Sequence, residues 1–214
     1  MMAFLPDFAT IATFTLMGWL LAITPGPDMT ISISRALADG RLGAMWVILG
    51  TSCGLVVHTM LVAFGVSALI VASPAAFTVL RTGGAGYLVW LAIQAIRKGS
   101  SLSVKRAAGP PNGARKNFLT GLGVNLLNPK VIIFFMTFLP QFVQATDPHV
   151  TGKLIFLGLW LILIGMPVNI LVALTAQSLS GWLQRNRHVL RGIDYTFAGV
   201  FSLFAVKIWM TQAR

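Results

Sequence analysis

Long apolar stretches separated by short polar segments dominate the pattern of this 214-residue chain. A helix needs about 20 predominantly apolar residues to cross a bilayer. Six stretches approach or exceed that length, at about 8–27, 43–71, 78–96, 118–143, 154–176 and 192–210. The third is the weakest, because Arg81 lies near its start. The pattern predicts an all-α integral membrane protein with six transmembrane helices.

Two short segments rich in helix breakers interrupt the apolar pattern at corresponding positions of the two halves. They are Thr24-Pro25-Gly26-Pro27-Asp28 and Asn128-Pro129-Lys130. Each places an ionisable side chain beside a proline, where hydrocarbon offers no partner for a charge or for freed backbone groups. Such breaks are buried in protein or line a cavity. A matched pair of them is typical of the binding site of a secondary transporter.

Short blocks of similar sequence recur in the same order in the two halves. Gly40-Arg41-Leu42 precedes the second stretch, and Gly152-Lys153-Leu154 precedes the fifth. Three spans per repeat is an odd number, so the second repeat must cross the membrane in the opposite direction. The sequence therefore predicts a single membrane domain that consists of two inverted three-helix repeats, in which helices 1 and 4 are broken by proline. Within 1–214, repeat 1 covers about 1–97, a basic cytoplasmic loop about 97–117, and repeat 2 about 118–214.

Composition agrees with a membrane location and argues against several other classes. Hydrophobic residues make up 56% of the chain and charged residues 10%, with a net charge of +11. The basic residues lie mainly in the loops, where they direct topology and attract membrane lipids, so nucleic acid is not an expected partner. One cysteine, and three histidines without a metal-binding spacing, predict no metal site. No Gly-rich phosphate loop occurs, so we expect neither ATP nor another cofactor.

Two other classes of protein compete with the transporter hypothesis. A membrane-embedded enzyme is disfavoured, because the sequence places no Ser/His/Asp cluster at membrane depth, so no catalytic residue is predicted. A small membrane channel or a scaffold subunit stays open as the alternative. The charged pair of breaks favours a binding site over a pore. Saturable, proton-linked efflux distinguishes the transporter from the channel.

The two breaks predict helix N-termini that point into the membrane. We expect Thr24 to cap the helix that resumes after it, with Pro25 at the first helical position, where its missing N–H costs nothing. Asn128 and Pro129 repeat this arrangement in the second half. The predicted half-helices cover about 25–37 and 129–138. Helix N-termini carry partial positive charge, so two of them facing each other suit a carboxylate.

Asp28 and Lys130 bring opposite charges to the two breaks. We expect Asp28 to bind a substrate ammonium group or to carry a coupling proton, and Lys130 to neutralise Asp28 or to hold a carboxylate. Two alternatives stay open at this point. The two residues could form an ion pair that holds the repeats together, or the first span could end at Pro25 and leave Asp28 at the wet interface.

His58 is a second candidate for proton coupling. It follows Gly50 and Gly54 at four-residue spacing, so the three residues share one helix face. The two glycines form a small-residue surface that allows close approach of another helix. His58 is then either a residue that reaches the site or a hydrogen-bonded packing histidine.

Three asparagines complete the predicted site. Asn125 lies one turn before Asn128 and is expected to line the same cavity. Asn169 follows Pro167 and either contacts the substrate or satisfies backbone groups freed by that proline. The predicted substrate-binding residues are Thr24, Pro25, Gly26, Pro27, Asp28, Asn125, Asn128, Pro129, Lys130 and Asn169, with Asp28 and His58 for proton coupling.

Three motifs carry a resemblance to a known family. They are Gly18 followed by Thr24-Pro25-Gly26-Pro27-Asp28, then Asn125-Leu126-Leu127-Asn128-Pro129-Lys130, then Phe134-Phe135 with Phe138-Leu139-Pro140-Gln141-Phe142. Through them the chain resembles the LysE/RhtB-type (lysine exporter / homoserine-threonine resistance) amino-acid translocator family over essentially its whole length. One departure is Ala22, near the place where the family often has a second glycine, and alanine is small enough to keep the packing.

The resemblance implies export of amino acids or close derivatives from the cytoplasm across a bacterial inner membrane, by proton antiport. The implied partners are a small-molecule amino-acid substrate, protons and membrane lipids. The resemblance does not identify the substrate, because members of the family export basic, neutral and hydroxylated amino acids. A homodimer is a further expectation, because one three-plus-three unit is small.

The basic residues also predict the orientation of the chain in the membrane. Residues 97–116 carry six Lys or Arg and no acid, so this loop is expected in the cytoplasm and both termini outside. A cysteine placed at Ser101 should therefore resist a membrane-impermeant thiol reagent added to intact cells. Labelling of Ser101→Cys from the outside refutes this orientation.

Overall fold

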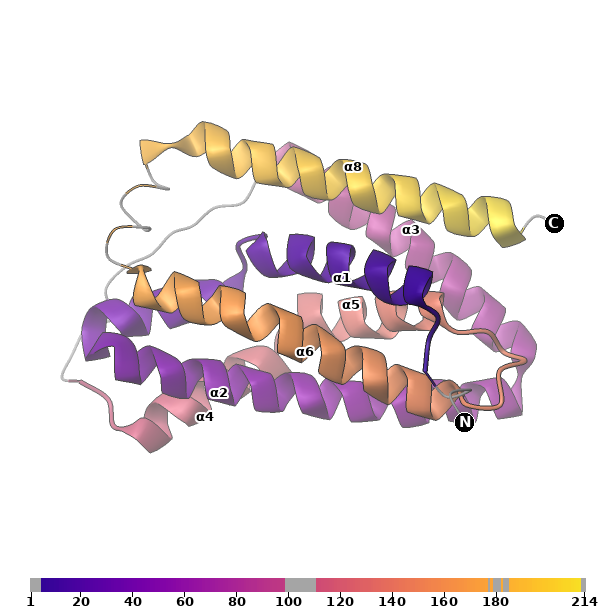
Figure 1. The fold of residues 1–214 in the computed structure, drawn as a ribbon, viewed down its shortest axis with the longest axis horizontal. Coiled ribbons are helices and arrows are strands. Elements are labelled where there is room, and N and C mark those ends of the chain that lie inside the picture. The colour runs from indigo at the N-terminus through magenta and orange to yellow at the C-terminus, as the bar shows by residue number, and fades with distance from the viewer. Residues whose placement is uncertain (1–4, 99–110, 177, 179–181, 183–184, 213–214) are drawn as a thin grey trace.

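The computed structural model describes residues 5–98, 111–176, 178, 182 and 185–212, and these residues form helices without a strand. The elements are α1 (Phe8–Ile23), α2 (Pro27–Ala72), α3 (Pro74–Lys98), α4 (Ala114–Leu126), α5 (Pro129–Phe138), the 3-10 helix η1 (Leu139–Phe142), α6 (Val150–Leu174) and α8 (Arg187–Gln212) (Figure 1). Most of the predicted basic loop, residues 99–110, lies outside the described residues.

Four of the described helices, α2, α3, α6 and α8, are long and apolar enough to cross a membrane. The pair α4 and α5–η1 makes a fifth span if it counts as one helix bent by 56°. α1 has 16 residues, about 24 Å of helix, whereas a hydrocarbon core measures about 30 Å. The prediction of an all-α membrane protein is therefore confirmed. The prediction of six spans is not confirmed, because the first break ends α1 before the predicted 8–27 stretch is complete.

The two breaks lie inside the bundle because of how the helices are layered (Figure 1). α3 and α8 run side by side, while α2 packs against α4 and α6. α1 and α5 lie between these two groups, with α1 against α6 and α5 against α3. α1 and α5 flank the breaks, so the backbone groups that the breaks leave without a helical partner face protein. Such groups cannot face lipid, because hydrocarbon offers them no hydrogen bonds.

Aromatic side chains fix α5 against α8. Phe134 and Phe138 are buried and stack with 4.6 Å between their ring centroids. Phe201 of α8 lies 6.2 Å from Phe134 and 5.9 Å from Phe138, and Phe197 stacks on Phe201 at 4.3 Å. Aromatic pairs at such distances contribute roughly 0.5–1.5 kcal/mol each beyond the burial of their surface. The cluster therefore anchors the second half-helix next to the break that precedes it.

Glycines bring α2 and α4 into direct backbone contact. A Cβ atom at Gly50 would overlap the carbonyl oxygen of Phe118, and one at Gly121 would overlap the carbonyl oxygen of Val47. A Cβ atom at Gly54 would overlap the side chain of Asn125. The predicted role of Gly50 and Gly54, to allow close approach of another helix, is confirmed.

Gly40 divides α2 into a short and a long helix, residues 27–39 and 41–72. Its φ of 75° lies in the left-handed region that favours glycine. Arg35 and Asp39 form an ion pair at 3.6 Å beside this bend, and the amide of Asn112 donates to Oδ1 of Asp39 at 3.1 Å. The first half-helix thus begins and ends two residues later than the predicted 25–37.

We expect Gly50→Ala to destabilise the protein by roughly 1–3 kcal/mol, because the added methyl group overlaps the backbone of α4. Gly65→Ala on the same helix is the matched control, since no atom lies within 4 Å of a Cβ built there. Alanine has a higher helix propensity than glycine, so Gly65→Ala should leave the stability of the protein unchanged or raise it. Thermal unfolding of the purified protein in detergent measures both variants. Equal midpoints contradict the contact between α2 and α4.

Candidate functional site

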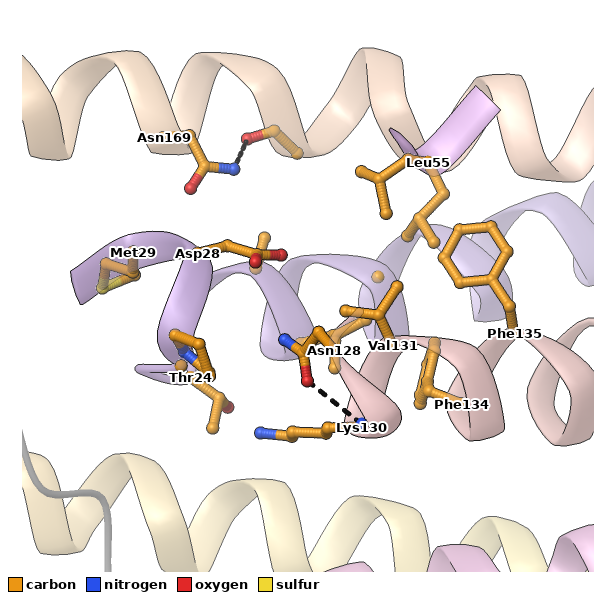
Figure 2. A pocket seen from close by; sticks show the side chains of 17 residues that line it. Thr24, Asp28, Met29, Leu55, Asn128, Lys130, Val131, Phe134, Phe135 and Asn169 are labelled. Carbon is orange, nitrogen blue, oxygen red and sulfur yellow. Dashed lines mark hydrogen bonds between the residues drawn. The ribbon is translucent and has the colours of Figure 1, made fainter. Parts of the chain in front are cut away.

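A cavity of about 130 Å³ lies where the two breaks meet, among α1, α2, α5 and α6 (Figure 2). Seven residues predicted from the sequence line it: Thr24, Gly26, Pro27, Asp28, Asn128, Lys130 and Asn169. Its apolar wall includes Leu21, Leu55, Val131, Phe134, Phe135 and Leu161. The predicted residues Pro25, Asn125, Pro129 and His58 do not line it. The cavity therefore combines one acid, one base and two amides with a mostly apolar surround.

The first break ends α1 and starts α2 in a way that differs from the prediction. Thr24 is the C-cap of α1, and its hydroxyl donates to the carbonyl of Leu20 at 2.7 Å. Gly26 is the extended N-cap of α2, and Pro27 is its first residue. The expectation that Thr24 caps the following helix with Pro25 first was wrong. The residue before a proline is disfavoured in the helical conformation, so Gly26 delays the helix until Pro27.

The second break follows the predicted arrangement. Asn128 is the N-cap of α5, and Pro129 is its first residue. Oδ1 of Asn128 accepts from the amide of Lys130 at 3.1 Å, and its carbonyl oxygen accepts from the amide of Val131 at 3.0 Å. The first amides of α5 are thus already bonded, whereas Gly26 provides no side chain to cap α2. Of the two helix N-termini, that of α2 is the more open to an anion.

Asp28 takes its hydrogen bond from the second half of the chain. Nδ2 of Asn125 donates to Oδ2 of Asp28 at 2.8 Å, and Asn125 is fully buried against Gly54 behind the cavity. Oδ1 of Asp28 is buried without a hydrogen-bond partner in the structure. A buried carboxylate oxygen without a hydrogen bond costs free energy, so it favours a ligand that brings a hydrogen-bond donor.

Lys130 lines the same cavity but forms no ion pair with Asp28. The ion pairs seen in the described part of the chain include Arg35–Asp39 and Lys153–Asp147, and none joins Lys130 to Asp28. In Figure 2 the Asn128 side chain lies between the Asp28 and Lys130 side chains. The alternative in which a direct pair holds the repeats together is therefore not realised in this conformation.

His58 and Asn169 take different positions relative to the cavity. Nε2 of His58 lies 3.3 Å from the carbonyl oxygen of Asn125, and its ring lies 5.8 Å from that of Phe135. Asn169 lines the cavity, and its Nδ2 donates to the carbonyl of Gly165 at 3.1 Å. The amide of Asn169 thus binds its own helix, and its carbonyl oxygen is the group left for a ligand.

Sequence reasoning missed one buried acid, Asp194 on α8, which is fully buried. The available signal was an aspartate near the start of the last apolar stretch. Pro25, by contrast, lines a separate apolar cleft bounded by α1, α6 and α8. Among the described residues, no group of three or more His, Cys, Asp or Glu could hold a metal ion.

A cavity with one acid and one base at two interrupted helices, inside a helical membrane protein, has the features of a transporter site. The model of the LysE type translocator family matches residues 19–212. The chain belongs to this family, as its motifs predicted. A translocator family is consistent with the prediction that the chain is not an enzyme.

Similar proteins come from several bacteria. The homoserine/homoserine lactone efflux protein of Salmonella typhimurium is 32% identical over 196 residues, which cover 92% of each chain. The threonine efflux protein of Escherichia coli is 32% identical over 56% of this chain and 60% of its own length. An uncharacterized membrane protein of Vibrio cholerae is 36% identical over 61% of this chain and 63% of its own. No solved structure matches the chain.

Family and relatives together confirm two predictions made from the sequence. The chain is an exporter of amino acids or close derivatives. It is a multi-pass protein of the bacterial inner membrane.

We expect Asp28 and Asn125 to be energetically coupled, because each loses its partner when the other is removed. In a double-mutant cycle of Asp28→Ala and Asn125→Ala, the double variant should be more stable than additivity predicts, by roughly 0.5–3 kcal/mol. The control cycle combines Asn125→Ala with Asp7→Ala, which removes an exposed acid at the start of α1. Unfolding in detergent measures both cycles. If the Asp28 cycle is as additive as the control, the hydrogen bond does not form.

Proposed function

We propose that this chain exports a small neutral amino acid from the cytoplasm in exchange for protons, and that the cavity between the breaks is its substrate site. The observation that carries the proposal is that Asp28 and Lys130 line one cavity without forming a direct ion pair with each other. A zwitterionic amino acid carries an ammonium group that can pair with Asp28 and a carboxylate that can pair with Lys130. Binding then replaces water around both side chains with one ligand of complementary charge.

Asp28 is the partner that we assign to the substrate ammonium group. Its Oδ2 is held in place by Asn125, while its Oδ1 has no donor in the structure. An ammonium group brings three N–H donors and a positive charge, so it satisfies the orphaned oxygen. Asn125 lies behind the cavity and therefore acts by orienting Asp28.

Lys130 and the start of α2 are the partners that we assign to the substrate carboxylate. The Lys130 side chain lines the cavity and carries the only base there. The N-terminus of α2 adds amides that no side chain caps, together with the positive end of the helix dipole. The N-terminus of α5 contributes less, because Asn128 already binds its first amide.

The walls of the cavity favour a substrate with a short side chain. Phe134 and Phe135 are buried and anchored by packing, and Leu161, which also lines the cavity, is buried too. Thr24 and Asn169 add polar groups that suit a hydroxyl. The relatives named for homoserine and threonine efflux agree with a short hydroxylated side chain. Threonine and homoserine are therefore the substrates to test first.

The proposed architecture is two inverted repeats that move relative to each other around this site. In the first half, α1, the break and residues 27–39 precede two long helices. In the second half, α4, the break and α5 precede α6 and α8. The similar order of elements supports the repeat hypothesis, with domain limits at about 1–97 and 118–214. The homodimer stays a prediction.

Proton antiport follows from competition at Asp28. A proton and a substrate ammonium group both neutralise the same carboxylate, so one leaves when the other binds. This exclusion is sufficient to couple the two movements when the cavity opens to each side in turn. His58 is the second candidate, since it contacts the backbone of Asn125 but does not line the cavity.

Transport by purified protein in proteoliposomes tests the proposal. Vesicles with an acidic lumen should accumulate labelled L-threonine or L-homoserine above the outside concentration, because protons leave as substrate enters. Asp28→Asn should lose this accumulation while retaining some substrate binding, and Lys130→Met should lose transport because the carboxylate has no cationic partner. Asp147→Asn is the control, since this acid pairs with Lys153 outside the cavity.

Two results contradict the proposal. Accumulation by Asp28→Asn at the wild-type level removes Asp28 from the coupling mechanism and transfers that role to His58. Flux through the wild-type protein that does not saturate with either amino acid identifies a channel in place of a transporter.

A further inference from the structure

A second hollow, an apolar cleft of about 710 Å³, is bounded by the first break, the last turns of α6 and the start of α8. No charged side chain is among the described residues that line it. The hydroxyl of Thr175 donates to the carbonyl of Leu171 at 2.7 Å, and that of Ser178 donates to the carbonyl of Thr175 at 3.1 Å. The wall therefore offers hydrocarbon to a ligand, which does not suit a zwitterionic amino acid.

The cleft is open to the surroundings of the helix bundle. Ile23, Leu171 and Trp182 line it and are exposed although they are large and apolar. Around a multi-pass membrane protein these surroundings are the acyl chains of lipids. An empty cleft beside them forfeits dispersion contacts that an inserted acyl chain restores. Hydrocarbon is therefore the ligand that the walls of the cleft favour.

The cleft ends in a basic region at the start of α8. The amide of Asn186 bonds to the carbonyl of Trp182 at 2.9 Å, so Trp182 and the exposed Arg185 lie within one helical turn. Nη1 of Arg191 donates to the carbonyl of Ile96 at 2.9 Å. This bond places the start of α8 beside the end of α3, where the basic loop begins (Figure 1). We expect that loop in the cytoplasm.

The charge of this region suits an anionic headgroup. Residues 177–191 contain three arginines and no acid. Tryptophan concentrates at the membrane–water interface, and basic residues there attract the anionic lipids of the cytoplasmic leaflet. A phospholipid therefore matches the cleft at both ends, with its phosphate at the basic region and one acyl chain along the apolar wall.

The first break is the wall between the cleft and the substrate cavity. Met29 is buried and lines both spaces. Pro25 lines the cleft, whereas Thr24 and Gly26 on either side of it line the cavity. An acyl chain in the cleft thus packs against the back of the segment that forms one side of the substrate cavity.

We propose that the cleft binds one acyl chain of an anionic phospholipid from the cytoplasmic leaflet, and that this chain supports the first break from the lipid side. The headgroup lies near Arg185, and the chain reaches Pro25 and Met29. This binding site is additional to the proposed function, because it requires the cleft and its basic end but no amino-acid substrate.

Trp182 reports on the cleft directly when it is the only tryptophan of the full-length protein. Bromine atoms on an acyl chain quench the fluorescence of a tryptophan that they contact. Titration in detergent with phosphatidylglycerol brominated on its acyl chains should quench Trp182 in a saturable manner. The other tryptophans are replaced by phenylalanine: Trp19, Trp46, Trp90, Trp160 and Trp209.

The matched control keeps Trp90 as the only tryptophan. Its exposed fraction is 49%, against 50% for Trp182, but it lies on α3 and does not line the cleft. Trp90 should be quenched only in proportion to the brominated lipid in the micelle, without saturation. Identical quenching curves for Trp90 and Trp182 overturn the proposal.

Two further outcomes of the titration concern the identity of the ligand. Brominated phosphatidylcholine carries no net charge, so half-saturation at Trp182 should need about tenfold more of it than of phosphatidylglycerol. Equal half-saturation by the two lipids overturns the anionic headgroup. If the protein is a dimer in which Trp182 is shielded from both lipids, a second copy of the chain fills the cleft and the proposal is overturned.

The second experiment leaves all the tryptophans in place. Native mass spectrometry counts phosphatidylglycerol bound to the wild-type protein and to Leu171→Trp, whose larger side chain occupies part of the cleft. We expect Leu171→Trp to weaken binding of one lipid about tenfold. Leu174→Trp is the matched control, since Leu174 is exposed on the same helix but does not line the cleft. Equal binding by the two variants overturns the proposal, and Leu171→Phe replaces Leu171→Trp if the latter does not fold.

These measurements separate the inference from the proposed function. If the wild-type protein transports neither threonine nor homoserine, the proposed function fails, while the lipid titrations still decide whether the cleft binds an acyl chain. If the protein transports and Trp182 shows no saturable quenching, the inference is overturned and the proposed function stands.

Discussion

Backbone groups and charges released by a helix break have no partner in hydrocarbon, and this constraint governs the whole structure. The protein meets it with local caps from Thr24 and Asn128 and with one hydrogen bond between the two halves, from Nδ2 of Asn125 to Oδ2 of Asp28. The bond joins the last turn of α4 to the first turn of α2. Both half-helices, the cavity between them and the position of its charges depend on this junction.

Glycine makes the junction possible. Helices in a membrane gain little from burying apolar surface, because lipid tails are as apolar as leucine, so they associate through close packing and hydrogen bonds. Gly50 and Gly121 let the backbones of α2 and α4 touch, and Gly54 leaves the space that Asn125 occupies. Any larger side chain at Gly54 would push Asn125 away from Asp28. The small residues thus position a charge as well as two helices.

Local preferences of proline and of capping residues predicted the structure of a break correctly where only one such preference applied. At the second break Asn128 caps α5 and Pro129 opens it, as the preference of proline for the first helical position predicts. At the first break the same rule favoured Pro25, but Gly26 is restricted by the proline after it, so the helix starts at Pro27. Where two local rules competed, the sequence did not show which one would prevail.

The sequence by itself determined the class of this protein, its apolar helices, its two breaks and the family to which it belongs. Only the tertiary structure decided which residues meet. Asp28 bonds to Asn125, 97 positions away. Periodicity along a chain reports which face of a helix is apolar, but it does not report which helix will cover that face. The partners of each charge therefore depend on packing between distant segments, which local pattern does not encode.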